Sequence, residues 1–190
     1  MFTRLSSRLS TLIILVCCLV VLVPVLVAAQ DIPAPDKHLD DLKWLIGEWD
    51  VVYKKYDQGS WSEYKAHSTF EYIMHDHAVA QAMDVIREQN PKAVFRTLSY
   101  NTVSEQFEDT WISTYDDGTS TFYGTFANNT YVAYNGSFLD KDYNPGAEDY
   151  GIRDTMDKIT ENSFTWHEEE THDGGETWEP FLVLEFTRVK

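Results

Sequence analysis

The stretch Leu45-Ile46-Gly47-Glu48-Trp49-Asp50-Val51 decides the fold of this chain. A Gly-x-Trp at the start of a first strand is typical of small antiparallel barrels that enclose a ligand cavity. Gly47 lets the chain turn sharply out of a short preceding helix, because glycine tolerates backbone conformations closed to other residues. Trp49 is expected to cap the floor of the barrel, and Arg188, near the C-terminus, to lie over its indole ring as a cation–π partner.

From Gly47 to the C-terminus the pattern is that of strands alone. Short runs rich in Val, Thr, Tyr, Phe and Trp recur at a spacing of roughly ten residues, separated by turn-forming residues, as in sandwiches and barrels. The predicted strands are Glu48–Tyr56, Trp61–Met74, Ala78–Arg87, Ala93–Tyr100, Phe107–Tyr115, Ser120–Ala127, Tyr131–Leu139, Ile152–Thr160, Ser163–Thr171 and Trp178–Val189. The turns between them are short, which predicts an all-β, up-and-down antiparallel barrel of about ten strands.

Residues 1–29 have the pattern of a secretory signal peptide. Arg4 and Arg8 precede an apolar run over residues 12–27, and the small residues Ala28 and Ala29 follow it. The alternative is an uncleaved membrane anchor, but the run is near the lower length limit for a bilayer span and Pro24 interrupts it. We therefore expect cleavage and a secreted or periplasmic protein.

The remaining chain is expected to form a linker over residues 30–37 and one calycin-like barrel domain over residues 38–190. Asp36 can cap a short helix that carries Leu39, Leu42 and Leu45 on one side. Both cysteines, Cys17 and Cys18, lie in the signal. Packing rather than disulfide bonds must therefore stabilise the mature domain.

The chain is strongly acidic. It has 15 basic and 31 acidic residues, a formal net charge of −16. Loss of Arg4 and Arg8 with the signal leaves 13 basic residues against 31 acidic ones, a net charge of −18. Such a charge opposes binding to nucleic acid and, once the signal is removed, to anionic membranes. It favours a cationic or neutral apolar ligand over an anionic one.

The opening at residues 45–51 resembles that of the calycin superfamily of lipocalin-like barrels. Four further stretches, 95–100, 107–112, 171–178 and 184–188, resemble an uncharacterised, mainly bacterial family of calycin-like proteins, a domain of unknown function. The specific parts are the Gly-x-Trp, an Asp-Gly-Gly-x-Thr-Trp hairpin and the final Arg. The resemblance implies a barrel over almost the whole mature chain and no established catalytic residues.

Residues Thr171–Trp178 also match the Asp-box of sialidase-type propellers. A propeller needs several such blades and this chain has one, so we interpret the motif as a turn device. Asp173 can accept backbone N–H groups across the turn, Gly174 and Gly175 supply positive φ, and Trp178 packs under the hairpin. We therefore assign these four residues, with Gly47, Trp49 and Arg188, a structural role.

The histidines offer a weak metal or catalytic hypothesis. His75 and His77 would share a face in a strand, and His67 lies upstream on the preceding predicted strand. They lie near a predicted turn, where ordinary polar residues are common. His167 is a further hypothesis, a haem ligand, which the residues after Gly47-Glu48-Trp49 disfavour. We expect no cofactor and assign no catalytic residue.

The aromatic residues of the strands are the best indication of function. Half should face the interior, and an apolar cavity with a few hydroxyls is typical of a small-molecule site. The candidate ligand-binding residues are Val51, Tyr53, Phe95, Trp111, Tyr134 and Trp166. We expect a secreted barrel that binds a small hydrophobic or aromatic molecule. The alternatives are an isomerase or hydrolase with a His/carboxylate site at the barrel mouth, using His67, His75, His77 or Asp109, and a fully packed barrel without a cavity.

Overall fold

The computed structural model describes residues 34–87, 92–114, 119–136 and 149–190. The chain divides into Met1–Ala34 and Pro35–Lys190, and the second unit carries the fold. The expected signal peptide, most of the linker and the turns at 89–91, 116–118 and 144–146 lie outside the described residues. Within the described ranges, no helix is both long and apolar enough to cross a bilayer.

A 3₁₀ helix, η1 (Lys37–Leu45), precedes the first strand. Asp36 caps it as expected, since its side chain accepts a hydrogen bond of 2.9 Å from the His38 backbone N–H. Leu39, Leu42 and Leu45 are all buried. Their spacing of three matches the three residues per turn of a 3₁₀ helix and brings them onto one face.

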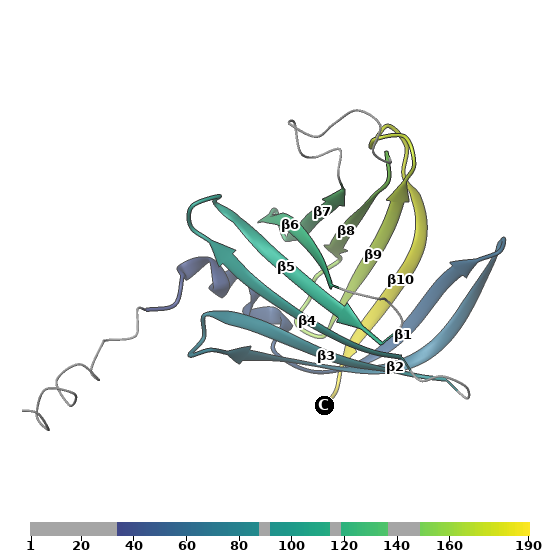
Figure 1. Cartoon of the computed structure of the whole chain (residues 1–190). Helices are drawn as coiled ribbons and strands as arrows, with labels where there is room; N and C mark the ends of the chain where they lie inside the picture. Colours follow the sequence, from purple (N-terminus) through teal and green to yellow (C-terminus); the bar gives the residue numbers. More distant parts are fainter. Residues whose placement is uncertain (1–33, 88–91, 115–118, 137–148) are drawn as a thin grey trace, which may run out of the picture. The chain divides into compact units, whose positions relative to one another are not determined.

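Ten antiparallel strands form a closed barrel in the order β1-β10-β9-β8-β7-β6-β5-β4-β3-β2 (Figure 1). The strands are β1 (Gly47–Asp57), β2 (Ser60–Ile73), β3 (Ala78–Ile86), β4 (Lys92–Asn101), β5 (Gln106–Ser113), β6 (Thr119–Ala127), β7 (Thr130–Gly136), β8 (Gly151–Asp157), β9 (Ser163–Thr171) and β10 (Glu179–Arg188). The predicted all-β barrel is confirmed. Closure pairs every strand on both edges and leaves no edge exposed.

The two ends of the barrel differ. At one end, called here the closed end, lie η1 and the β2–β3, β4–β5, β6–β7 and β8–β9 turns (Figure 1). The Trp49 indole N–H donates to the Leu45 carbonyl over 2.7 Å, and the His38 ring stacks on Tyr100 at 4.1 Å between centroids. These contacts hold η1 against the barrel. The opposite end, called the open end, carries the β1–β2 and β9–β10 turns.

Aromatic rings fill the closed end of the interior. Phe164 and Phe186 stack at 4.1 Å between centroids, and the Trp49 ring meets Phe164 edge-on at 5.0 Å. Phe70 lies 6.3 Å from Phe164 and 6.1 Å from Phe186. All four side chains are buried. The aromatic side chains at this end therefore pack against one another and form the core.

The pairing of Trp49 with Arg188 closes the barrel, as predicted. These residues are register partners between β1 and β10, and the guanidinium carbon lies 4.1 Å from the indole centroid. Gly47 has a φ of +133°, and a Cβ atom there would lie 2.6 Å from Nη1 of Arg188. Glycine at this position therefore meets two demands at once, an unusual backbone angle and close approach of a guanidinium.

The β9–β10 turn is built around Asp173, as its sequence predicts. Its carboxylate accepts hydrogen bonds from the Thr177 N–H at 2.9 Å, the Thr177 hydroxyl at 2.5 Å and the Thr171 hydroxyl at 2.7 Å. Gly174 and Gly175 have φ values of +71° and +91°. These hydrogen bonds, led by the one from the Thr177 hydroxyl, lower the pKa of Asp173 to about 2.

Candidate functional site

A cluster of charged side chains lies in the middle of the barrel interior. Arg96 on β4 forms a bidentate ion pair with Asp109 on β5. Its Nη2 also donates to a carboxylate oxygen of Asp154 on β8 at 2.9 Å. The Tyr131 hydroxyl donates to Asp109 at 3.3 Å. Glu168 on β9 is the register partner of Asp154, and all five residues are buried.

The cluster holds three carboxylates and one guanidinium, which shapes its protonation. Burial raises the pKa of Asp154 well above its usual range, the charge of Glu168 raises it further, and Arg96 only partly opposes this. Burial likewise raises the pKa of the Tyr131 hydroxyl, with Asp109 adding to the effect. Burial works against the charged form of Arg96, but Asp109 and Asp154 more than compensate and raise its pKa. The raised pKa of Asp154 favours its protonated form, and the raised pKa of Arg96 favours its charged form.

Arg96 crosses the barrel. In the strand order, β4 and β9 lie on opposite sides of the closed ring. The Arg96 guanidinium carbon nevertheless lies 3.8 Å from the ring centroid of Trp166 on β9. This cation–π contact, with the bonds to Asp109 and Asp154, makes a polar layer between the aromatic closed end and the open end.

Nη1 of Arg96 and Oε1 of Gln81 are buried in this layer without a hydrogen-bond partner among the described residues. Gln81 on β3 is the register partner of Arg96, and its amide donates to Ser68 at 3.0 Å. Buried polar groups in proteins are almost always satisfied, by protein, water or ligand. The layer therefore offers both a donor and an acceptor to a small polar group.

A pocket of about 170 Å³ opens above this layer, at the open end of the barrel. Its lining residues come from β1, β4, β5, β8, β9 and β10 and from the segment before β8: Tyr53, Lys55, Lys92, Trp111, Tyr150, Ile152, Glu168, Phe181 and Leu182. Glu168 belongs to both the pocket and the charged cluster. The pocket thus has aromatic walls and a charged floor, the mixture expected of a small-molecule site.

Cations and aromatic rings share one wall of this end. The Lys92 ammonium lies 5.4 Å from the Trp111 ring centroid and 5.9 Å from that of Tyr53. The Arg87 guanidinium carbon lies 4.3 Å from the Tyr64 centroid and 5.7 Å from that of Tyr53. These cation–π contacts hold the positive charges beside the pocket.

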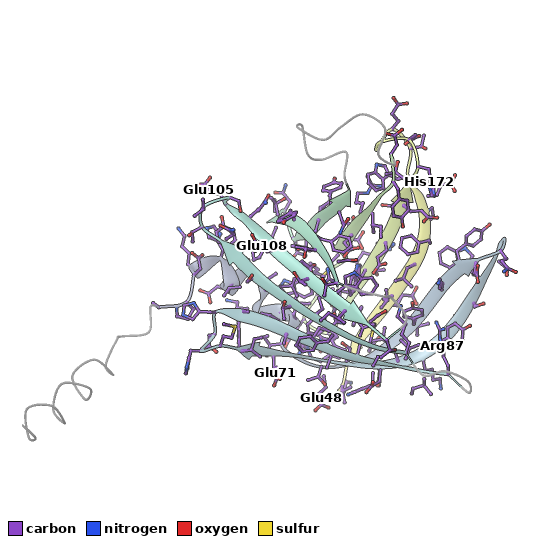
Figure 2. All side chains as sticks on the ribbon, viewed as in Figure 1. Glu48, Glu71, Arg87, Glu105, Glu108 and His172 are labelled. Atoms are coloured by element: carbon purple, nitrogen blue, oxygen red, sulfur yellow. The ribbon has the colours of Figure 1, made fainter. Side chains whose placement is uncertain are left out.

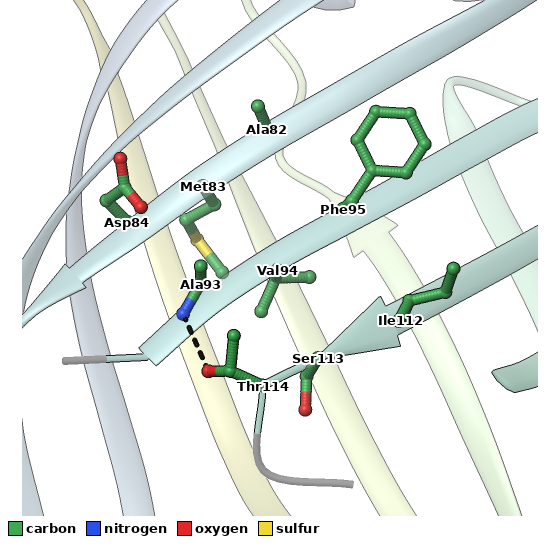
Figure 3. Close-up of a pocket in the computed structure, with 9 residues that line it drawn as sticks. All are labelled: Ala82, Met83, Asp84, Ala93, Val94, Phe95, Ile112, Ser113 and Thr114. Carbon is green, nitrogen blue, oxygen red and sulfur yellow. Dashed lines mark hydrogen bonds between the residues drawn. The ribbon is translucent and has the colours of Figure 1, made fainter. Parts of the chain in front are cut away.

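A second, larger groove of about 310 Å³ lies on the outside of β3, β4 and β5 (Figure 3). Phe95 and Ile112 line it and are each 47% exposed. The Ala93 backbone N–H donates to the Thr114 hydroxyl at 3.2 Å at the strand ends. This groove is separate from the barrel interior, since Phe95 and Ile112 alternate with the inward-facing Arg96 and Trp111.

The structure divides the six predicted ligand-binding residues. Tyr53 and Trp111 line the open-end pocket, and Trp166 lies beneath it under Arg96. Val51 is buried towards the closed end. Two others face outward: Phe95 lines the outer groove, and Tyr134 packs on Trp178 at 6.0 Å between ring centroids. Side chains alternate between the inner and outer faces along each strand, which separates the two groups. The sequence identifies the inward-facing positions only near Trp49.

The predicted histidines do not come together. His67 lies on the outer face of β2, with Nδ1 3.6 Å from a carboxylate oxygen of Asp50. His75 and His77 lie in and beside the β2–β3 turn, at the closed end. His167 contacts Asp157 at 3.2 Å. In the described part of the chain, no group of three or more His, Cys, Asp or Glu side chains could hold a metal ion.

The charged layer was missed in the sequence, apart from Asp109, yet it left a signal there. Arg96 lies between Val94 and Leu98 in the inward phase of β4. Asp154 lies in the same way between Ile152 and Met156 of β8. A charged residue at a position where alternation predicts an inward-facing side chain has two explanations. Either the inner face of the strand has been assigned wrongly, or the charge is buried in an ion pair. Choosing between the two required knowing which strands face each other.

The fold and its pocket define a lipocalin-like closed barrel. A family model described as "Protein of unknown function (DUF1579)" matches residues 34–188, and the chain belongs to this family. The family match confirms the resemblance seen in the sequence. No functionally curated protein matches the chain.

Two solved structures share this fold at low sequence identity. One is Rv2717c from M. tuberculosis, with a TM-score of 0.55 and 13% identity over 83% of this chain and all of that chain. The other is the S-type phycobiliprotein lyase CPES from Guillardia theta, with a TM-score of 0.51 and 8% identity over 83% of this chain and 99% of that one. At these identities the likeness concerns the fold alone.

Proposed function

We propose that this protein binds a small, partly aromatic molecule in the open-end pocket and does so without catalysing a reaction. The observation that carries the proposal is the pocket between Tyr53 and Trp111, above the layer that Arg96 forms. An apolar cavity of about 150 Å³ in another protein accommodates benzene. A pocket of about 170 Å³ therefore suits one aromatic ring with a short substituent.

The arrangement of the interior supports binding over a fully packed barrel. Aromatic packing fills the closed end, whereas the open end retains a pocket whose lining includes both rings and charges. The unpartnered Nη1 of Arg96 and Oε1 of Gln81 further favour a polar group in or near the floor. The phycobiliprotein lyase fold agrees with a barrel that takes a small molecule, but its own chemistry does not transfer.

An enzyme with a His/carboxylate site at the barrel mouth has less support. His67, His75 and His77, the residues on which that alternative depended, lie away from the pocket. His172 lies at the open end, labelled in Figure 2, with Nε2 3.7 Å from a Glu170 carboxylate oxygen. That distance exceeds a hydrogen bond, so the pair does not form an assembled acid–base site.

The N-terminal pattern supports a location outside the cytoplasm, and we include export in the proposal. Immunoblotting of cell fractions, with N-terminal sequencing of the mature protein, tests it. Export with cleavage near Ala29 predicts a mature chain that begins at or near Gln30. A full-length chain retained in the cytoplasm or in the membrane fraction would contradict the prediction.

Ligand-observed NMR with indole as a neutral aromatic probe tests the binding site. Saturation transfer from protein to indole is expected for the unaltered protein and is expected to be lost in Trp111→Ala, which removes a pocket wall. Ile112→Ala is the matched control, since Ile112 is the next residue but lines the outer groove. Loss of transfer in Ile112→Ala with retention in Trp111→Ala would place the site in the outer groove and overturn the proposal.

A further inference from the structure

We propose that the ligand of the open-end pocket carries an anionic group, a carboxylate on or near its aromatic ring, and that this group faces Lys92 on β4. The inference rests on the proposed function and names the chemical class of its ligand. It departs from the expectation set by net charge, since the chain as a whole is strongly acidic. The placement of the charges, rather than their sum, carries the argument.

Acidic residues dominate the outside of the barrel. Glu48, Glu71, Glu105 and Glu108, labelled in Figure 2, all lie away from the interior. Lys54 also faces outward and pairs with Glu185 at 2.8 Å. The next residue, Lys55, faces the pocket. The pocket lining holds two ammonium groups, those of Lys55 and Lys92, against one carboxylate, so its local charge is opposite in sign to that of the chain.

The positive groups at this end lie against aromatic rings. Lys92 lies beside Trp111 and Tyr53, and Arg87 beside Tyr64 and Tyr53. A cation held over a ring face keeps its charge, and an ammonium has three N–H donors. A ligand whose ring meets Tyr53 and Trp111 would therefore bring a carboxylate within reach of Lys92.

The opposite wall gives the ligand a direction. Glu168 lies on β9, which is opposite β4 in the barrel, and Glu170 and Tyr150 lie on the same side. Glu168 repels an anion on the β9 side, whereas Lys92 on β4 attracts it on the opposite side. The ligand's aromatic part would then lie between these two sides, and its carboxylate would face Lys92 on β4.

An isosteric series tests the charge preference: phenylacetate, phenylacetamide and phenethylamine, with binding measured by saturation-transfer NMR titration at low and high salt. We expect phenylacetate to bind about 5- to 10-fold more tightly than phenylacetamide, because charge pairs at a partly exposed site contribute modestly. Phenethylamine should bind most weakly. The ratio should fall as salt screens the charges.

Lysine variants then test whether the pocket lysines cause this preference for an anionic probe. Lys92→Met and, independently, Lys55→Met should each lower the phenylacetate-to-phenylacetamide ratio several-fold. Lys54→Met removes the same charge from the outer face and should leave the ratio unchanged. Equal binding of the three probes, or tightest binding of phenethylamine, overturns the inference while leaving an aromatic site in place. Absence of binding by all three overturns both this inference and the proposed function.

Discussion

The Arg188 guanidinium lies 4.1 Å from the centre of the Trp49 indole ring and joins the last strand of the barrel to the first. It also donates hydrogen bonds to the carbonyl oxygens of Trp44 at 2.6 Å, Ile46 at 2.7 Å and Glu161 at 2.8 Å. One side chain thus satisfies carbonyls at the end of η1, before β1 and in the β8–β9 turn. Arg188 therefore holds three separate parts of the closed end together.

Arg188→Lys is expected to lower the free energy of unfolding by about 1–3 kcal/mol, because a single ammonium cannot stack on Trp49 and reach three carbonyls together. Trp49→Ala should cost about 3–5 kcal/mol through the cavity it leaves among Phe164 and Phe186. Urea denaturation followed by circular dichroism measures both. Lys190→Met is the control at the C-terminus. An Arg188→Lys variant as stable as the unaltered protein would contradict the closing role of the guanidinium.

Gly47→Ala should destabilise the protein by about 2 kcal/mol or more, because the φ of +133° is strained for alanine and its Cβ would clash with Arg188. Combining it with Arg188→Ala separates the two causes. Relief of the clash makes the double variant more stable than the sum of the single effects predicts, whereas backbone strain alone gives additive losses. Denaturant titration of the four proteins completes the cycle.

The fold could be predicted from this sequence because its signals are local. Turn residues and alternation place the ten strands within three residues of their observed ends, apart from the last residues predicted for the fifth and seventh, which lie outside the described part. Trp49 and Arg188 could be paired because a closed meander makes its first and last strands neighbours. Neither inference required knowing which residues of distant strands share a layer.

The candidate site could be predicted only in part, because it depends on such layers. Tyr53 and Trp111 line the open-end pocket, whereas Phe95 and Tyr134 lie on the outer face, because alternation along a strand defines two faces without identifying the inner one. The bond from Arg96 to Asp154 joins residues 58 apart in sequence. No local pattern reveals that contact.

Arg96→Met should be among the most destabilising single changes in the interior, with a loss of about 3–5 kcal/mol at neutral pH. It leaves the Asp109 carboxylate buried without the guanidinium that compensates it, and Asp154 without its hydrogen-bond donor. The outcome is measured by urea denaturation. Arg153→Met is the matched control, because Arg153 pairs with Glu169 on the outer face, where pairs contribute little. Equal losses in the two variants would contradict the importance of the buried layer.

Asp173→Asn should remove an acid-dependent part of the stability. The pKa of Asp173 is about 2, below that of an unfolded aspartate near about 3.9. Its contribution is therefore present above about pH 4 and is lost as the pH falls towards 2. Urea midpoints between pH 2 and 5 should fall less steeply in Asp173→Asn than in the unaltered protein. Glu63→Gln, on the outer face of β2, is the control, and parallel pH profiles for all three proteins would contradict the prediction.

Asp154 should act in the opposite direction along the pH scale. Burial and the charge of Glu168 raise the pKa of Asp154 in the folded state. Its protonated form therefore stabilises the fold fully below the unfolded pKa of about 3.9. This contribution is lost as the pH rises through the raised pKa of the folded state. Asp154→Asn imitates the protonated carboxyl. We therefore expect the variant to lose less stability with rising pH than the unaltered protein. At neutral pH it should cost less than Asp109→Asn, which breaks the bidentate pair with Arg96. Urea midpoints from pH 4 to 9 measure both effects, and a larger loss in Asp154→Asn than in Asp109→Asn would show that Asp154 is charged in the folded protein.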